Sequence, residues 1–312
     1  MKILITSKSF GKNNKDALKM LEDNGFTLVY GSRPTMSAQE ISREIKGIDI
    51  LVVGNDTIDR EVLDAADQLK LIHMHGTGLD GIDVKYAAEK GIRVLNAPGA
   101  NSNAVAELTI GLMLAAGRDM IRHSINLRKG LWERQAGAEI SGSTICIFGL
   151  GHIGKRIVQL LKGFRVKVLA LDPAADALWA RQNDVELSED AERLFREADF
   201  LILALPLLEN TRHLVDERAL SLMKPTAFII NTARGGLIDE KAVAQAVREK
   251  RIAGAGIDAF SIEPPPENSP LRFEGITITP HLAATSIQSS ARVSGIVAEN
   301  IITMMREWQD QK

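Results

Sequence analysis

The sequence of 312 residues contains a single cysteine, Cys146. This scarcity excludes an internal disulfide and any metal site built from several cysteines, and we predict no metal site. Cys146 lies inside an apolar segment, where a thiol is usually buried and unreactive. A chain with so little cysteine is typical of a reducing compartment, so we expect a cytoplasmic protein.

The sequence also has no large excess of charge of one sign and no long apolar run. Lys and Arg number 38 and Asp and Glu number 40, which gives a formal net charge of −2 at pH 7. Such a balance supplies no basic field for nucleic acid and no polycationic surface for a membrane. No apolar run reaches the length of a bilayer span, and the short apolar start Met1–Thr6 predicts a strand rather than a signal peptide. We therefore expect a soluble protein that binds neither nucleic acid nor membranes.

Short apolar runs alternate with amphipathic segments, which predicts parallel strands joined by crossover helices. The first series has strands over 3–5, 27–29, 50–53, 71–73 and 93–95, and helices over 16–24, 38–46 and 59–66. The second series has strands over 144–148, 167–171, 200–204, 227–231, 254–258 and 276–278, and helices over 151–162, 217–222 and 240–248. The chain also exceeds the length at which one core usually stops growing. The predicted fold class is α/β, with two doubly wound parallel-sheet (Rossmann-like) domains and a cleft between them.

Two further helices bear on the domain organisation. A long helical segment over 101–122 is apolar on too many sides to face solvent, which indicates burial either between domains or between subunits. A last helix over about 286–308 follows the second series and could return to the first domain. We therefore predict a discontinuous, flavodoxin-like first domain of residues 1–99 plus 285–312, and a second domain of residues 100–284.

A glycine-rich segment, Gly149-Leu150-Gly151-His152-Ile153-Gly154, joins a predicted strand to a predicted helix. Gly149 permits a tight turn, Gly151 lets the backbone approach a pyrophosphate, and Gly154 allows the helix to pack closely on the strand. The pyrophosphate would meet the free N–H groups at the start of the helix. Asp172 lies 18 residues beyond Gly154, and its carboxylate can accept both ribose hydroxyls of NAD and repel the 2′-phosphate of NADP. The predicted cofactor is NAD, and a glycine turn that binds nothing is the alternative.

Three ionisable residues follow at or just after the carboxyl ends of apolar strands, where ligands bind in open α/β sheets: Arg234, Glu263 and His281. Interconversion of a 2-hydroxy acid and a 2-keto acid needs a planar cation that grips the carboxylate, a role that suits Arg234. It needs a general acid/base near neutral pH, which suits His281, and a carboxylate that orients the imidazole, which suits Glu263. Each residue alone is commonly structural, but their coincidence with a dinucleotide loop favours catalysis.

These motifs resemble the D-2-hydroxyacid dehydrogenase family, and the likeness covers nearly the whole chain. The segments that carry it are Gly149–Gly154, Asn231–Asp239, Gly256–Phe260 with Glu263-Pro264-Pro265, and Pro280-His281. Four others indicate the phosphoglycerate dehydrogenase-like branch: Gly76–Asp83, Asn96-Ala97-Pro98, Ala106-Glu107-Leu108 and Trp132-Glu133-Arg134.

The resemblance implies that Arg234, Glu263 and His281 are catalytic, and that the first and last of them also contact the substrate. It implies that the backbone of Thr77 and Gly78 holds the substrate carboxylate. The residues that it assigns to the cofactor, beyond the glycines and Asp172, are His152, Ile153, Thr232, Ala233 and, at the nicotinamide carboxamide, Asp258. It also implies that the first domain binds the substrate, that the second binds NAD, and that a homodimer forms on the helix after Asn101.

Some positions depart from the phosphoglycerate dehydrogenase pattern. Such enzymes often carry arginines where this chain has Gly54 and Met74, and Asp56 adds a negative charge nearby. Only Arg134 matches a phosphate-contacting position, so a dianionic phosphate would be poorly compensated. Ala283 stands where the family usually has glycine, and we expect no carboxyl-terminal regulatory domain, because the sequence ends at Lys312.

We therefore predict an NAD-dependent oxidoreductase that transfers a hydride between the cofactor and C2 of a small D-2-hydroxy acid or 2-keto acid, with glyoxylate or hydroxypyruvate favoured. A 3-phosphoglycerate dehydrogenase is the alternative within this class. An NAD-sensing, corepressor-like binding protein is the alternative of another class, because such proteins share the fold and the catalytic trio. A formate dehydrogenase is disfavoured, because that branch has glutamine where this chain has Glu263. His73 and His75 flank the presumed substrate loop and are expected to be structural, although either could contact a polar substrate.

Overall fold

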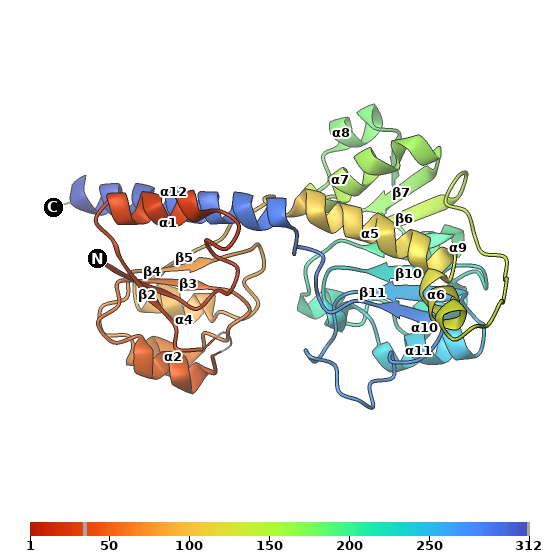
Figure 1. Ribbon diagram of the computed structural model, residues 1–312. Helices are drawn as coiled ribbons and strands as arrows, with labels where there is room; N and C mark the ends of the chain where they lie inside the picture. The colour runs from red at the N-terminus through yellow and green to blue at the C-terminus, as the bar shows by residue number, and fades with distance from the viewer. Residues whose placement is uncertain (34–35, 311–312) are drawn as a thin grey trace. The chain divides into compact units, whose positions relative to one another are not determined.

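The computed structural model describes residues 1–33 and 36–310, which form two compact units (Figure 1). The first unit comprises Met1–Asn101 and Ala284–Lys312, and the second comprises Ser102–Ala283. The sequence predicted divisions after residues 99 and 284, and residues 311 and 312 of its first domain lie outside the described residues. The cleft predicted between the domains stays a prediction.

The first unit contains a parallel sheet with the strand order β2-β1-β3-β4-β5. Its strands are β1 (Lys2–Ile5), β2 (Thr27–Tyr30), β3 (Ile50–Val53), β4 (Leu71–Met74) and β5 (Arg93–Leu95). Every strand predicted here is present, with ends that differ by at most one residue. In this flavodoxin-like order the chain reverses its direction across the sheet between β1 and β3, and ligands bind at the carboxyl ends of strands beside such a switch point.

The helices of the first unit cover both faces of this sheet. They are α1 (Lys15–Asp23), α2 (Ala38–Glu44), α3 (Arg60–Ala65), α4 (Val84–Glu89) and α12 (Ile287–Asp310). Figure 1 shows α1 and α12 side by side along one face, where Leu21 and Val297 pack with Ile3 in one core cluster. Leu4 points to the opposite face and packs with residues of α2, α3 and α4. The last helix therefore packs in the first unit, as the sequence suggested.

The second unit contains a seven-stranded parallel sheet with the order β12-β11-β10-β9-β6-β7-β8. Its strands are β6 (Thr144–Phe148), β7 (Lys167–Leu171), β8 (Val185–Leu187), β9 (Phe200–Leu203), β10 (Phe228–Asn231), β11 (Gly254–Ile257) and β12 (Ile276–Ile278). The switch point lies between β6 and β9. The sequence did not predict β8, because this edge strand has three residues, of which Glu186 and Leu187 are exposed and leave no apolar run.

Helices again cover both faces of the second sheet. They are α5 (Ser102–Gly117), α6 (Met120–Arg128), α7 (His152–Leu161), α8 (Ala177–Gln182), α9 (Ala191–Glu197), α10 (Glu217–Leu222) and α11 (Glu240–Arg248), with short 3-10 turns η1 (Lys162–Phe164), η2 (Glu209–Thr211) and η3 (Gly235–Leu237). One core cluster joins α5, α7 and α8 to the sheet. The other joins α9, α10 and α11 to the opposite face.

The single helix predicted over 101–122 is wrong in its extent. It ends at Gly117, whose carbonyl accepts a hydrogen bond from the Ala138 N–H (2.7 Å), and α6 starts only at Met120. Asp119 between them has a φ of 47°, a left-handed conformation that interrupts a right-handed helix. The N–H of Ala138, which is distant in sequence, thus occupies the last carbonyl of α5, and the helix ends there. No local sequence pattern predicts this contact.

The buried side of α5 packs against α7, β10 and β11 of its own unit (Figure 1). Leu112 and Met113 are almost completely buried there. Leu114 lies partly exposed on another side of the helix. The burial of this helix between domains or between subunits stays a prediction.

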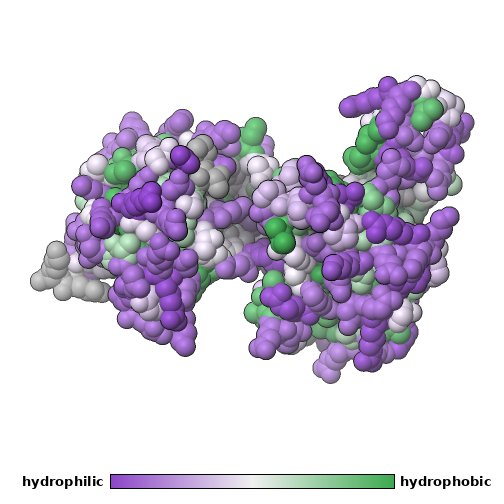
Figure 2. Space-filling view, turned by 90° about the horizontal axis from the view of Figure 1, so that it is seen from below, coloured by the Kyte–Doolittle hydropathy of each residue, from purple (hydrophilic) through white to green (hydrophobic). Residues whose placement is uncertain are grey.

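On the surface seen in Figure 2, hydrophilic residues prevail and hydrophobic residues occur in small groups. Within the described part of the chain, no helix is long and apolar enough to cross a membrane. The cytoplasmic location expected from the sequence stays a prediction.

Candidate functional site

The glycine-rich loop connects β6 to α7 at the switch point of the second sheet. Gly149 has a φ of +94°, and a Cβ there would lie 2.3 Å from the Ala204 carbonyl oxygen, just after β9. A Cβ on Gly154 would lie 2.2 Å from the Gly149 carbonyl oxygen, so the start of α7 packs directly on the loop. At Gly151, the residue before α7, a Cβ would meet no atom within 4 Å. The tight turn, the close packing and the open approach predicted for these three glycines therefore fit their surroundings.

Asp172 follows β7 and is tied to the same loop. Its Oδ2 accepts a hydrogen bond from the Leu150 N–H (2.8 Å), and its Oδ1 accepts one from the Ala174 N–H (2.8 Å). A carboxylate can accept about four hydrogen bonds, so acceptor capacity remains for a ligand. His152 and Ile153 form the first turn of α7, with His152 exposed and Ile153 partly buried. The predicted cofactor residues 149–154 and 172 thus form one connected group.

His281 and Glu263 form a direct pair. The imidazole Nδ1 lies 2.7 Å from Glu263 Oε2 and 2.8 Å from Oε1. Because an ionised carboxylate only accepts hydrogen bonds, Nδ1 carries a proton and donates it, which leaves Nε2 to exchange a proton with a ligand. Glu263 Oε1 also accepts a hydrogen bond from the Phe260 N–H (3.0 Å). The two side chains predicted to act together are therefore in contact, and the loop backbone holds the carboxylate.

Arg234 lies in the turn after β10, and a buried asparagine closes this turn. The Asn231 side chain is completely buried, its Nδ2 donates to the Arg234 carbonyl (2.9 Å), and its Oδ1 accepts from the Ala233 N–H (3.1 Å). Arg234 Nη1 donates to the Ala233 carbonyl (2.8 Å). Asn231 was part of a motif in the sequence, but only the fold shows that its side chain spans the turn.

The turn of Arg234 and the loop of Glu263 touch through their backbones. A Cβ on Gly235 would lie 1.9 Å from the Phe260 carbonyl carbon and 2.1 Å from the Ser261 nitrogen. No side chain fits at this contact, so glycine is required after Arg234. The structure therefore brings all three predicted catalytic residues to one edge of the second sheet.

Asp258 holds the loop of His281 in place. Its completely buried carboxylate accepts hydrogen bonds from the Thr279 hydroxyl (2.6 Å), the Leu282 N–H (2.9 Å) and the Ala283 N–H (2.8 Å). Its carbonyl accepts from the His281 N–H (2.9 Å). The sequence assigned Asp258 to the cofactor by resemblance and missed this positioning role, for which its place at the end of an apolar strand was the only signal.

Thr232 and Ala233 follow β10, and Thr232 is fastened to α5. The Thr109 hydroxyl donates to the Val105 carbonyl (2.8 Å) and lies 2.8 Å from the Thr232 hydroxyl. Because the Thr109 proton is already committed, Thr232 is the donor of this second hydrogen bond. Ala233 is partly buried beside it. The helix that the sequence could not place thus supports the predicted cofactor edge.

Thr77 and Gly78 belong to the first unit, in the loop after β4. The Asn96 side chain donates to the Thr77 carbonyl (2.7 Å), and Asn101 Nδ2 lies 3.4 Å from the Thr77 hydroxyl. Within residues 1–33 and 36–310, the N–H groups of Thr77 and Gly78 have no hydrogen-bond partner. Two unpaired N–H groups in succession suit a carboxylate ligand.

His73, on β4, is a structural residue, as expected. It is completely buried, its Nδ1 donates to the Met74 carbonyl (2.9 Å), and its Nε2 accepts from Asn300 Nδ2 on α12 (3.0 Å). Burial lowers the pKa of His73 to about 4, so the ring is neutral near pH 7.

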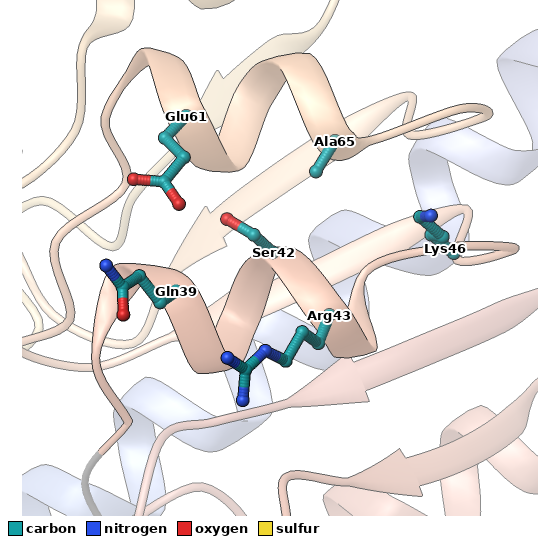
Figure 3. A pocket seen from close by; sticks show the side chains of 6 residues that line it. All are labelled: Gln39, Ser42, Arg43, Lys46, Glu61 and Ala65. Atoms are coloured by element: carbon teal, nitrogen blue, oxygen red, sulfur yellow. The ribbon is translucent and has the colours of Figure 1, made fainter.

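A surface pocket lies between α2 and α3 of the first unit. Figure 3 shows its lining side chains, which are Gln39, Ser42, Arg43, Lys46, Glu61 and Ala65. None of them was predicted as a site residue, and none comes from the carboxyl end of a strand. The strand edges, rather than this pocket, therefore carry the candidate chemistry.

Comparison with known proteins gives concordant matches. The sequence model described as "D-isomer specific 2-hydroxyacid dehydrogenase, NAD binding domain" matches residues 110–283. D-3-phosphoglycerate dehydrogenase of Methanocaldococcus jannaschii is 40% identical over 309 residues, which cover 98% of this chain and 58% of that protein. Hydroxypyruvate reductase of Thermotoga maritima is 38% identical over 273 residues, which cover 85% and 88%. The chain thus spans little more than half the length of the first relative and most of the second.

The fold also recurs among solved structures. The TT0316 protein from Thermus thermophilus superposes with a TM-score of 0.88 at 30% identity, over 98% of this chain and 97% of that one. The two Rossmann-like domains predicted from the sequence are confirmed by this similarity and by the two parallel sheets.

Replacing Asp258 by asparagine should loosen the loop of His281. Asp258→Asn keeps the size of the side chain but turns an NH2 group toward backbone N–H donors, so we expect the free energy of unfolding to fall by about 1–3 kcal/mol. Urea unfolding measures this loss, and hydrogen exchange of residues 279–283 should quicken. The control is Asp190→Asn, which exchanges one good N-cap residue for another at the start of α9. Equal stability and equal exchange in the two variants would refute the positioning role.

Proposed function

Because the chain belongs to the D-isomer specific 2-hydroxyacid dehydrogenase family, we propose that it transfers a hydride between NAD(H) and C2 of a small D-2-hydroxy acid or its 2-keto acid. The observation that carries this proposal is the His281–Glu263 pair, at 2.7 Å, beside the Arg234 turn. The glycine-rich loop fits a dinucleotide, because Gly151 is open and the N–H groups of α7 follow it. When bound, the nicotinamide supplies or accepts the hydride.

The side chains of the site account for the rest of the chemistry. In the direction of reduction, His281 Nε2 donates a proton to the oxygen at C2 as that oxygen becomes a hydroxyl. Glu263 holds the ring through Nδ1 and balances the charge of the imidazolium. Arg234 binds the substrate carboxylate and polarises the carbonyl, and the N–H groups of Thr77 and Gly78 are the further proposed donors to that carboxylate.

The choice of substrate follows from the charges near the predicted substrate loop. Gly54 and the nearly buried Met74 add no positive charge, and Asp56 adds a negative one, so a phosphate would find little compensation. A non-phosphorylated acid such as glyoxylate or hydroxypyruvate suits this environment. The relative from Thermotoga maritima bears the name hydroxypyruvate reductase, whereas the one from Methanocaldococcus jannaschii makes 3-phosphoglycerate the second candidate.

Removing the proton donor should abolish most of the activity. His281→Ala should lower kcat for the NADH-dependent reduction of hydroxypyruvate at least 100-fold, because general acid/base catalysis contributes about 10²–10⁴-fold. Glu263→Gln should cause a smaller loss, because it keeps an acceptor for Nδ1. The exposed His213, whose left-handed backbone asparagine tolerates, provides the control His213→Asn. A kcat of His281→Ala within tenfold of the wild type would contradict the proposed role, and wild-type inactivity on every 2-keto acid would favour a binding protein.

The preference for NAD over NADP depends on Asp172. Its carboxylate accepts ribose hydroxyls but repels a 2′-phosphate, so we expect kcat/KM with NADH to exceed that with NADPH about 100-fold. Asp172→Ser should reduce this ratio to about tenfold or less. The control is Asp176→Ser, which removes a neighbouring charge but keeps an N-cap residue at the start of α8. A higher kcat/KM with NADPH in the wild type would overturn the cofactor assignment.

We also propose that the chain forms a homodimer through α6 and its flanks. α6 has no buried residue, and seven large apolar side chains between residues 114 and 132 are 39–80% exposed: Leu114, Met120, Ile121, Ile125, Leu127, Leu131 and Trp132. We call these seven residues the α6 patch. A monomer seldom exposes so many apolar side chains over so short a segment, and the family resemblance places a dimer on this part of the chain.

Charges placed in the α6 patch should separate the subunits. The double variant Ile121→Glu with Ile125→Glu brings four carboxylates into a two-fold interface, so we expect a monomer by sedimentation velocity where the wild type is a dimer. Leu178→Glu is the control, because Leu178 is an exposed apolar residue of α8 outside the patch. A monomeric wild type at micromolar concentration would rule out this interface.

A further inference from the structure

Four polar side chains meet at the switch point of the first sheet, and the proposed function does not use them. Ser7 and Ser9 follow β1, His75 follows β4, and Ser294 lies on α12. The Ser7 and Ser9 hydroxyls are 3.4 Å apart, Ser9 Oγ lies 2.9 Å from His75 Nδ1, and His75 Nε2 lies 3.0 Å from Ser294 Oγ. We call Ser7, Ser9, His75 and Ser294 the hydroxyl–imidazole chain.

The direction of every hydrogen bond in this chain follows from its inner end. Ser294 Oγ donates its only proton to the Ser290 carbonyl (2.8 Å), which can only accept. Ser294 Oγ also accepts from the Gly11 N–H (3.2 Å), and its remaining lone pair faces His75 Nε2. His75 Nε2 must therefore be the donor and carry a proton.

The outer half of the chain is then oriented as well. Burial, helped by the nearby His73, lowers the pKa of His75 to about 4, so the neutral ring has one proton and Nδ1 is an acceptor. Ser9 therefore donates to Nδ1, and Ser7 donates to Ser9. All the protons of the hydroxyl–imidazole chain point away from Ser7 and toward α12.

Ser7 is left as a buried acceptor without a donor. The residue is 6% exposed, and within residues 1–33 and 36–310 the one side-chain hydrogen bond of its hydroxyl is the bond to Ser9. Both lone pairs of Ser7 Oγ are therefore unpaired, which is costly for a buried hydroxyl unless a ligand donates to it. The outer end of the chain thus offers acceptors and no protons.

The surroundings place this acceptor beside the predicted substrate loops. A Cβ on Gly54 would lie 3.5 Å from Ser7 Oγ, and His75 immediately precedes the loop Gly76–Gly78. Asp56 Oδ2 accepts hydrogen bonds from the Thr6 hydroxyl (2.6 Å) and the Gly54 N–H (3.0 Å), so a carboxylate stands on the same edge. The part of this edge around Ser7 and Asp56 therefore suits a neutral hydrogen-bond donor and disfavours an anion.

We propose that the hydroxyl–imidazole chain selects substrates that carry a hydroxyl group on C3, so that the enzyme prefers hydroxypyruvate to pyruvate and to 3-phosphohydroxypyruvate. This inference rests on the proposed function and deepens it. A C3 hydroxyl donates its proton to Ser7 Oγ, whereas the methyl group of pyruvate leaves that buried acceptor unpaired. A phosphate dianion brings only acceptor oxygens, which face the lone pairs of Ser7 and the charge of Asp56. His75 is a positioning residue, because it acts by orienting Ser9.

Wild-type kinetics with four acceptors test the selectivity directly. We would measure kcat/KM with NADH for hydroxypyruvate, pyruvate, glyoxylate and 3-phosphohydroxypyruvate. We expect hydroxypyruvate to exceed pyruvate at least tenfold and 3-phosphohydroxypyruvate at least 100-fold. Equal values for hydroxypyruvate and pyruvate, or a preference for the phosphorylated acid, would overturn the inference while leaving the proposed function intact. Absence of turnover with all four acids would overturn both.

Variants of the chain separate recognition from structural support. Ser7→Ala should lower kcat/KM for hydroxypyruvate about tenfold, mainly through KM, and leave glyoxylate, which lacks C3, within twofold of the wild type. Ser9→Ala and His75→Ala should show the same selective loss, and His75→Asn should restore part of it, because its side chain offers Ser9 an acceptor near the position of Nδ1. Ser290→Ala is the matched control: it removes the hydroxyl that donates to the Ser9 carbonyl (3.1 Å) but keeps the carbonyl at the end of the chain.

The ratio of kcat/KM for hydroxypyruvate to kcat/KM for glyoxylate distinguishes substrate recognition by the hydroxyl–imidazole chain from a purely structural role. A loss of equal size for hydroxypyruvate and glyoxylate in Ser7→Ala and Ser9→Ala would show that the chain only supports the fold and would refute its role in recognition. Thermal unfolding identifies a variant that fails to fold, and the ratio measured with the other serine variant then decides.

Discussion

The candidate site of the second unit depends on one buried charge, the carboxylate of Asp258. A charge without solvent is very costly unless hydrogen bonds replace its water shell, and here a hydroxyl and two backbone N–H groups do so. All three donors come from the loop that carries His281. The requirement to satisfy Asp258 therefore determines the path of that loop, and the path determines where the imidazole lies.

Close backbone contacts extend this constraint to the rest of the edge. Gly149 lies against Ala204 at the switch point, and Gly235 lies against Phe260 between the turn of Arg234 and the loop of Glu263. At both places a single methyl group would overlap main-chain atoms. The cofactor loop, the arginine turn and the acid–base pair are thus brought to one edge by close backbone packing and by one buried carboxylate.

The first unit uses its switch point in a different way. Within residues 1–33 and 36–310, it presents unpaired N–H groups at Thr77 and Gly78 and unpaired lone pairs on Ser7 Oγ, and a partly buried, neutral histidine joins Ser9 to Ser294. The proton on His75 is not decided by the histidine itself, whose two nitrogens are chemically similar. It is decided by Ser290, whose carbonyl accepts the Ser294 proton. Ser294 Oγ can then only accept from His75 Nε2, so the proton of the ring lies on Nε2. Specificity in such a network comes from the partners at its end.

The sequence alone determined the periodic elements and the identity of the chemical groups. Short apolar runs such as 144–148 and 50–53 are typical of buried strands, so the strands could be predicted. The glycines of 149–154 permit a tight turn and close packing of the helix, so this loop could be predicted as well. Contacts between distant segments decided the rest. Ala138 ends α5 at Gly117, Thr109 fastens Thr232, and Asp258 holds the loop of His281. Each of these joins residues that no local pattern relates, because the free energy of such a contact arises only after the chain has folded and the two partners have been brought together.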